Sequence, residues 1–169
     1  LSGGGARGLS HAGVLRALIS RGYVPSAIVG VSMGAVVGAT YALNDDWFDA
    51  LVAMDTSGFP ATPGFRLPGL AARMRGLRTA LLAARDMYFG WGSGARTETW
   101  GRSVLSGLTK GKNLQDGRIP AFVCATDMLS GQRVVFGKGD ATDYVYSSAA
   151  LAGILPPLVD DPYVLMDGA

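Results

Sequence analysis

A serine lies between two glycines where a short β-branched segment gives way to a helical pattern of small residues, and this feature constrains the fold most. The segment covers residues 28–42, IVGVSMGAVVGATYA, in which Gly30, Ser32 and Gly34 form Gly-x-Ser-x-Gly. β-branched residues are typical of a buried strand, and the small apolar residues after them are typical of a helix packed on a sheet. This unit predicts an α/β fold.

A serine on such a strand-to-helix turn has the properties of a nucleophile. The turn exposes Oγ, and Gly30 and Gly34 have no Cβ to clash there. The N-terminus of the following helix supplies N–H donors and a partial positive charge that favours an oxyanion. Ser32 is the only serine in the chain that fits the pattern. We therefore predict that Ser32 is a nucleophile; the alternative is a glycine-lined turn that packs a helix against the sheet.

The first eight residues, LSGGGARG, form a glycine-rich segment ahead of a helical pattern. A glycine run that opens a helix offers several N–H groups to an anion, because only glycine lets the backbone approach so closely. The amides of Gly3, Gly4 and Gly5 are therefore candidates for an oxyanion hole. Arg7 and Gly8 complete the loop.

The same loop also fits the dinucleotide-binding pattern Gly-x-Gly-x-x-Gly through Gly3, Gly5 and Gly8. That fold requires an acidic residue about 20 positions further on, at the end of the second strand, to bind the ribose. The first acidic residue of this chain is Asp45, and the expected second strand ends at the serine turn. Nucleotide binding is therefore disfavoured.

An aspartate follows the last apolar strand pattern, VLMDGA over residues 164–169. A carboxylate at the C-terminal end of a strand lies on the same rim of a parallel sheet as a serine turn, so Asp167 is a candidate base. Its alternative role is to open a turn or cap a helix. Asp127, after the strand that contains Cys124, is the rival base, although a turn role is expected for it. Asp160 and Asp161 are predicted to be loop carboxylates.

The chain has a single histidine, His11. A Ser-His-Asp hydrolase needs an imidazole between the nucleophile and the acid. His11 follows the glycine loop by three residues, so we expect it in the first turn of the first helix, packed or partly exposed. The sequence thus suggests a serine activated directly by a carboxylate, unless a histidine lies beyond this segment, as in a truncated α/β-hydrolase.

These three motifs, in this order, resemble those of the patatin-like phospholipase family. The family has a Gly-Gly-Gly-x-Arg-Gly loop, a Gly-x-Ser-x-Gly elbow and a later Asp-Gly-Ala, which match residues 3–8, 30–34 and 167–169. Residues 147–157 are also similar to the family's small-residue helix and proline turn. The chain departs from the pattern where Ala152-Gly153-Ile154 stands in place of a frequent proline. The resemblance extends over the whole chain.

The resemblance implies a three-layer α/β/α domain with a mainly parallel central sheet. It also implies a Ser-Asp dyad: Ser32 as nucleophile, Asp167 as base and then acid, and the amides of residues 3–5 as oxyanion hole. Arg7 would brace the loop. The implied activity is that of a serine lipid acyl hydrolase of phospholipase A or lysophospholipase type, acting on phospholipids or other acyl esters without a metal or other cofactor. A catalytically silent module that binds lipid or a partner is the second hypothesis.

Composition agrees with one globular domain over residues 1–169. Hydrophobic residues make up 49% of the chain and the net charge is +2. The abrupt start at Leu1 suggests a segment of a longer protein. Cys124 is predicted to be a structural thiol in a buried strand, and no cluster has metal-ligand spacing. No nucleic-acid-binding motif is recognised. The sequence gives no indication of oligomeric state.

Residues 59–100 combine arginines with apolar side chains. Such a basic amphipathic segment is expected either to contact anionic lipid and shape an acyl pocket, or to form an ordinary solvated helix packed on the sheet. No apolar stretch is long enough for a transmembrane helix, and no signal peptide is visible. We therefore expect a cytoplasmic or peripheral membrane location.

The hydrophobic pattern predicts the order of secondary structure. A hairpin turn is expected at residues 129–131, and Asp45 is expected to cap one helix. The predicted helices cover residues 11–21, 33–43, 45–54, 68–88 and 141–152, and the predicted strands cover residues 26–31, 119–126, 132–136 and 163–166.

Overall fold

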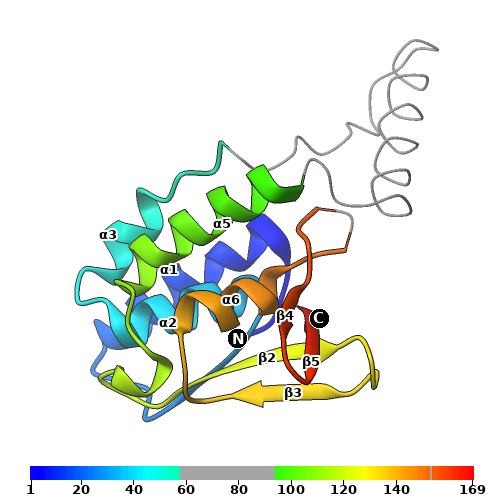
Figure 1. Cartoon of the computed structure of the whole chain (residues 1–169). Coiled ribbons are helices and arrows are strands. Elements are labelled where there is room, and N and C mark those ends of the chain that lie inside the picture. The colour runs from blue at the N-terminus through cyan, green and yellow to red at the C-terminus, as the bar shows by residue number, and fades with distance from the viewer. Residues whose placement is uncertain (58–93, 153) are drawn as a thin grey trace, which may run out of the picture.

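The computed structural model describes residues 1–57, 94–152 and 154–169. Helices are interspersed with strands of one sheet along the chain, so the α/β class is confirmed (Figure 1). The helices are η1 (Gly5–Leu9), α1 (Ser10–Ile19), α2 (Met33–Leu43), α3 (Trp47–Val52), α5 (Gly94–Thr109), η2 (Leu114–Asp116) and α6 (Ala141–Ala149), of which η1 and η2 are 3₁₀ helices. The strands are β1 (Ile28–Val31), β2 (Ala121–Asp127), β3 (Arg133–Phe136), β4 (Leu158–Asp160) and β5 (Tyr163–Asp167).

The sheet is mixed and centres on β2. Strand β1 runs parallel to β2, whereas β3 and β5 are antiparallel to it and β4 is antiparallel to β5. The parallel pairing expected of the sheet is thus found at the pair that carries the serine turn. Two of the antiparallel pairs, β2–β3 and β4–β5, are hairpins, because a short turn can join only antiparallel neighbours, whereas β2 and β5 are distant in the chain.

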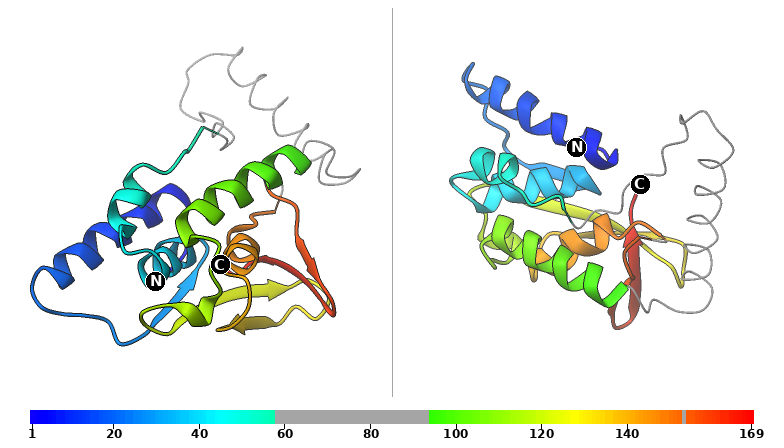
Figure 2. Two further views of the ribbon diagram at one scale, coloured as in Figure 1. Left: turned by 60° about the vertical axis from the view of Figure 1, so that its left-hand side comes forward. Right: turned by 90° about the horizontal axis from the view of Figure 1, so that it is seen from above.

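Helices α2 and α6 lie on one face of the sheet, and α5 packs over them (Figures 1 and 2). The side chains of β1 and β2 follow this arrangement: Ile28 and Val123 are buried beneath the helices, whereas Val29 is 50% and Phe122 is 37% exposed on the opposite face. Because neighbouring residues of a strand point to opposite faces, this alternation marks a sheet covered on one side. The described residues therefore supply two of the three expected layers.

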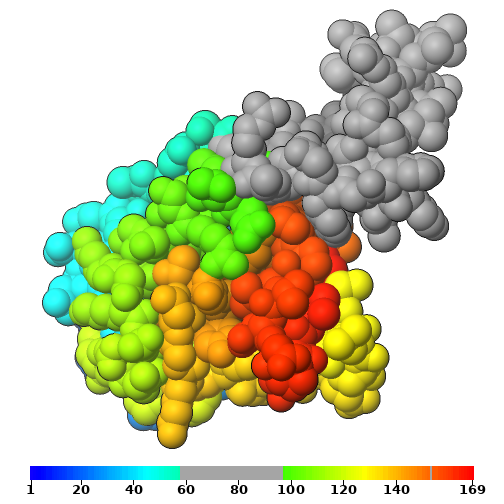
Figure 3. All heavy atoms as spheres, viewed as in Figure 1, coloured from blue at the N-terminus to red at the C-terminus, as the bar shows by residue number. Residues whose placement is uncertain are grey.

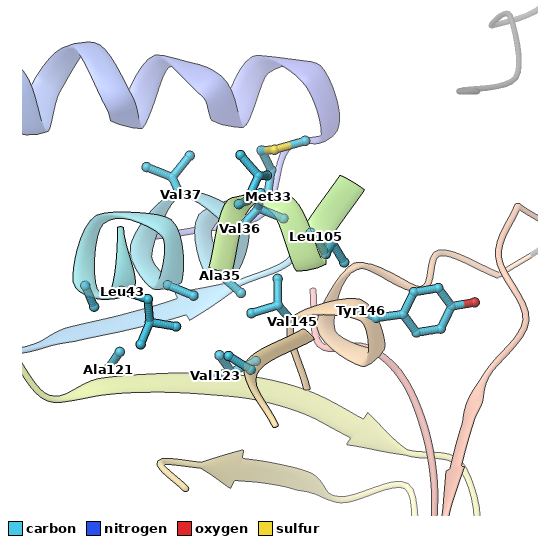
Figure 4. Close-up of a cluster of buried hydrophobic side chains, with 14 of the residues drawn as sticks. Met33, Ala35, Val36, Val37, Leu43, Leu105, Ala121, Val123, Val145 and Tyr146 are labelled. Atoms are coloured by element: carbon cyan, nitrogen blue, oxygen red, sulfur yellow. The ribbon is translucent and has the colours of Figure 1, made fainter. Parts of the chain in front are cut away.

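The core fills the space between the sheet and the helices, where side chains of α2, α5, α6 and β2 gather (Figure 4). Helix α2 is buried along its whole length, which its small residues permit. Val37, Leu114, Val145 and Leu165 have no measurable exposure. Full burial of such side chains contributes about 1.5–3 kcal/mol each to folding.

Most predicted elements are present within three residues of their expected limits, and α2 matches the predicted 33–43. Three predictions differ from the structure. Helix α3 begins at Trp47, after Asp46, so Asp45 does not cap it. Residues 94–109 form a helix that we did not expect, and Asp160 lies in β4 and not in a loop. The predicted helix at 68–88 lies outside the described residues.

Candidate active site

Two strands meet end to end along one edge of β2, and this meeting forms the site. Val31, the last residue of β1, pairs with Cys124, and Asp167, the last residue of β5, pairs with the next residue of β2, Ala125. The two strands run toward each other, because one is parallel and the other antiparallel to β2. Asp167 was expected on the rim of a parallel sheet; it reaches Ser32 instead through this antiparallel strand.

The hydroxyl of Ser32 donates a hydrogen bond of 2.7 Å from Oγ to Oδ2 of Asp167. The other carboxylate oxygen, Oδ1, accepts from the backbone N–H of Ala169 at 2.9 Å. Ser32 is only 9% exposed. A serine hydroxyl that already donates to a carboxylate is placed to lose its proton to that carboxylate.

Ser32 occupies the sharp turn with φ 54° and ψ −128°. This is a conformation that non-glycine residues seldom adopt, and it is typical of a strained serine turn at a strand-to-helix junction. Glycine is required on both sides of Ser32 because other parts of the backbone approach Gly30 and Gly34 closely. A Cβ at Gly30 would lie 2.5 Å from Cα of Ala35, and one at Gly34 would overlap the carbonyl of Leu1. The two glycines therefore allow the turn to pack as tightly as it does.

The glycine loop lies against this turn. Leu1 is hydrogen-bonded to β1, through its backbone nitrogen to the Val29 carbonyl at 2.7 Å and through its carbonyl to the Val31 N–H at 3.1 Å. The chain then passes beside the nucleophile, since a Cβ at Gly3 would be 3.2 Å from Cβ of Ser32. Residues 1–3 are thus held directly beside the candidate nucleophile.

The rest of the loop leads into η1. Gly4 and Gly5 have positive φ values of 153° and 53° and are exposed, whereas Gly8 is buried against Met33. Arg7 donates its backbone N–H to the Gly4 carbonyl at 3.2 Å. Within the part of the chain that the structure describes, the Arg7 guanidinium makes no hydrogen bond. Arg7 therefore contacts the loop through its own backbone N–H and not through its side chain.

His11 lies in the first turn of α1 and is partly exposed, as the sequence predicts. Its Nε2 is 3.0 Å from the carbonyl of Ser2, which immediately precedes Gly3. A carbonyl can only accept, so Nε2 must carry the hydrogen of this bond. His11 thus contacts the glycine loop, whereas Asp167 is the residue that bonds to the Ser32 hydroxyl.

Two residues that sequence reasoning did not single out support the pair from the end of α6. The hydroxyl of Ser148 accepts from the Ser32 N–H at 2.9 Å and donates to the Cys124 carbonyl at 2.6 Å. The carbonyl of Ala150 accepts from the Asp167 N–H at 3.1 Å. The only signal in the sequence was the run of small residues at this point, which is equally typical of a packed helix.

Asp127, the rival base, is engaged elsewhere. It accepts from the backbone N–H and hydroxyl of Ser130 and from the N–H groups of Leu129 and Val164. These hydrogen bonds, led by that of the Ser130 hydroxyl, lower the pKa of Asp127 to about 2. Such a carboxylate is held ionised by the hairpin turn, which is the turn role expected for it.

Cys124 is a buried free thiol in β2.

The α/β fold and the paired serine and aspartate place the chain in the class of α/β proteins with a serine-carboxylate site. The chain belongs to the patatin-like phospholipase family, whose model matches residues 1–169. The motifs that suggested the resemblance therefore led to the correct family.

Curated relatives agree with this assignment. The chain is 31% identical over 169 residues to lysophospholipase NTE1 of Mycosarcoma maydis and 29% identical over 170 residues to patatin-like phospholipase domain-containing protein 7 of Mus musculus. Each match covers 99% of this chain but only 8% and 11% of the relatives. The chain thus spans about a tenth of the length of these relatives.

A solved structure shares the fold. The chain resembles VipD of Legionella pneumophila with a TM-score of 0.57 and 14% sequence identity, over 98% of this chain and 44% of the other. At 14% sequence identity, this similarity shows a shared fold and nothing about function. Among the helices that the structure describes, none has the length and apolar character needed to cross a membrane.

Proposed function

We propose that this domain is a serine lipid acyl hydrolase that works through a Ser32–Asp167 dyad. The observation that carries the proposal is the 2.7 Å hydrogen bond from the Ser32 hydroxyl to the Asp167 carboxylate. In the first step Asp167 removes the Ser32 proton as Oγ attacks the ester carbonyl. The tetrahedral intermediate collapses as its ester C–O bond breaks and Asp167 gives the proton to the leaving alcohol, which leaves an acyl-enzyme on Ser32. Asp167 then takes a proton from the attacking water and returns it to Oγ as the fatty acid departs.

The glycine loop supports the proposed oxyanion hole by its position. Gly3 lies against Ser32, and Gly4 and Gly5 follow with exposed backbone. The Ser32 N–H is already donated to Ser148, so it is a poor donor for the oxyanion. We assign this function to the amides of residues 3–5, where one donor is worth about 10²- to 10³-fold in turnover.

A carboxylate is a weaker base than an imidazole, so the dyad depends on its surroundings. The hydrogen bond from Ser32 is formed before substrate arrives, and burial of Ser32 limits competition by water. Both features lower the cost of proton transfer. The proposal needs neither a metal nor another cofactor.

Phospholipids and lysophospholipids are the proposed substrates. The relatives from fungi are lysophospholipases by name, and the family is named for phospholipase activity. The basic amphipathic segment at residues 59–100, proposed to contact lipid, falls for the most part outside the described residues.

Fluorophosphonate labelling of the full chain, followed by measurement of fatty-acid release from mixed phospholipids and lysophospholipids, tests this proposal. We expect Ser32→Ala to abolish labelling and release, and Asp167→Asn to lower turnover by about 10²- to 10⁴-fold. Ser57→Ala, on an exposed segment, is the matched control and should retain both. If wild-type protein neither labels nor releases fatty acid, the domain is a silent binding module.

A further inference from the structure

We propose that Ser148 is a positioning residue that holds the strained serine turn in its reactive conformation. This inference rests on the proposed function, because it assigns Ser148 a role in the reaction of Ser32. Ser148 lies at the end of α6, 116 residues from Ser32, and has no measurable exposure.

The directions of the two hydrogen bonds of Ser148 are fixed by chemistry. A backbone N–H can only donate and a carbonyl can only accept, so the Ser148 hydroxyl accepts from Ser32 at 2.9 Å and gives its single hydrogen to Cys124 at 2.6 Å. Cys124 belongs to β2 and pairs with Val31, the residue before Ser32. One hydroxyl thus links the turn to the central strand.

The turn needs such support because of its backbone conformation. Ser32 has a φ of 54°, which is unfavourable for a residue with a Cβ and persists only where the surroundings hold it. On its C-terminal side the Ser32 carbonyl accepts from the N–H groups of Ala35 and Val36. On its N-terminal side the N–H is held by Ser148. Loss of the hydroxyl would release one side of the strained residue and let Oγ move relative to Asp167.

The same end of α6 also holds the other member of the dyad, since the Ala150 carbonyl accepts from the Asp167 N–H at 3.1 Å. Ser148 in the last turn of α6 and Ala150 just after it therefore hold Ser32 and Asp167 relative to each other. Figure 3 shows the chain around α6 between the green surface of α5 and the red surface of the β4–β5 hairpin. A displacement of about 1 Å between reacting groups is enough to slow an enzyme about 10²-fold.

Ser147 provides a matched control. It is the neighbour of Ser148, is equally buried, and donates its hydroxyl to the Tyr144 carbonyl of its own helix at 2.8 Å. Ser147→Ala and Ser148→Ala therefore each remove one buried hydroxyl from α6, but only the second removes a contact to the nucleophile.

The test compares the two alanine variants in the full chain. For Ser148→Ala we expect kcat for ester hydrolysis to fall about 10- to 100-fold with KM changed less than about twofold, and fluorophosphonate labelling to slow by the same factor. Ser147→Ala should keep the wild-type kcat. Ser148→Thr, which keeps a hydroxyl, should recover part of the lost activity, and the melting temperature of each variant confirms folding.

A second measurement does not depend on activity. Hydrogen exchange of peptides that contain residues 30–36 should speed up in Ser148→Ala and not in Ser147→Ala. Equal activity and equal exchange in Ser148→Ala and wild type would overturn the inference, as would equal losses in both alanine variants. Absence of labelling in wild type, with faster exchange only in Ser148→Ala, would contradict the proposed function and leave the support of the turn intact.

Discussion

Two aspartates that follow strands of this domain carry different hydrogen bonds. Asp167 accepts one hydrogen bond from a serine hydroxyl and one from a backbone N–H, which leaves it able to receive a proton from Ser32. Asp127 accepts four hydrogen bonds from its own hairpin and from β5. The sequence placed both at strand ends, where either could face the site. Only the pairing of the strands separates a structural carboxylate from a candidate base.

The low pKa of Asp127 gives a stability prediction. Its pKa falls from the ordinary value of 3.8 to about 2 in the folded protein. The stabilisation is therefore complete above the unfolded pKa and is lost as pH falls through about 4 toward 2. Asp127→Asn should unfold at lower urea concentration than wild type at pH 7, with the gap closing between pH 4 and pH 2. A gap that stayed constant down to pH 2 would contradict this account.

At the scale of elements, the packing of the glycine loop against the serine turn decides whether the site forms. The loop has no room for a side chain at Gly3, where a Cβ would lie 2.9 Å from Cβ of Ala169 and 3.2 Å from Cβ of Ser32. Gly168 is similarly confined, by the Cys124 carbonyl at 2.6 Å. Three segments distant in sequence thus approach one another at glycines.

Gly3→Ala should therefore displace the loop from Ser32. We expect kcat to fall by about 10²- to 10³-fold, the loss of one oxyanion donor, while the protein stays folded. Gly13→Ala is the control, because a Cβ at this exposed position of α1 meets no atom within 4 Å. Steady-state hydrolysis of a soluble ester measures both variants. Wild-type turnover in Gly3→Ala would show that the loop does not need this close contact.

The contact of His11 with the glycine loop leads to a prediction about α1. Its bond to the Ser2 carbonyl fixes the peptide unit whose N–H belongs to Gly3. His11→Ala should lower kcat about 3- to 10-fold, the effect of one ordinary hydrogen bond, and His11→Gln should restore part of it. A loss of 10³-fold or more would instead indicate that His11 takes part in proton transfer. The measurement is kcat and KM for all three proteins.

Much of the element pattern could be predicted from sequence, for reasons that particular residues show. Helix α2 follows from its unbroken run of small apolar residues after Ser32, and β2 from its apolar pattern. Helix α5 was not predicted because Gly94, Gly101 and Gly107 and several hydroxyl residues lower helix propensity, which tertiary contacts with α6 offset. The three-residue β4 is too short to give a pattern.

The sequence predicted which residues come together at the candidate site but not which residues support them. Ser32, Asp167 and the glycine loop were proposed from motifs that require those residue types, and the structure places Ser32 beside both Asp167 and Gly3. Ser148 and Ala150 were not, because a small residue in a helix has the same pattern whether it packs against a neighbour or bonds to a distant backbone. Only the structure shows that this end of α6 reaches Ser32 and Asp167.

On the scale of the whole molecule, some core residues lie apart from the hydrogen bonds of the site. Leu114 of η2 is fully buried in the core, whereas the hydrogen bonds of the site join the serine turn to Asp167 and to Ser148. The mixed sheet joins the two parts through β2. Loss of core volume should therefore affect stability more than turnover.

Leu114→Ala should lower the free energy of unfolding by about 2–5 kcal/mol, the usual cost of removing a buried leucine side chain. Val159→Ala, at a position that is 73% exposed, should change it by less than about 0.5 kcal/mol. Urea denaturation measures both. At a temperature well below melting, kcat/KM of Leu114→Ala should equal that of wild type, and a proportional loss of kcat/KM would show that core and site are coupled.

The end-to-end meeting of β1 and β5 along β2 has a consequence for how the protein acquires its chemistry. Ser32 and Asp167 are separated by 135 residues, and each reaches the other only when its strand has paired with consecutive residues of β2. A shift of β5 by one residue would move Asp167 by about 3.4 Å and turn its side chain to the other face. The candidate pair is therefore assembled only once both β1 and β5 have paired with β2, and labelling of Ser32 would report that both strands have docked.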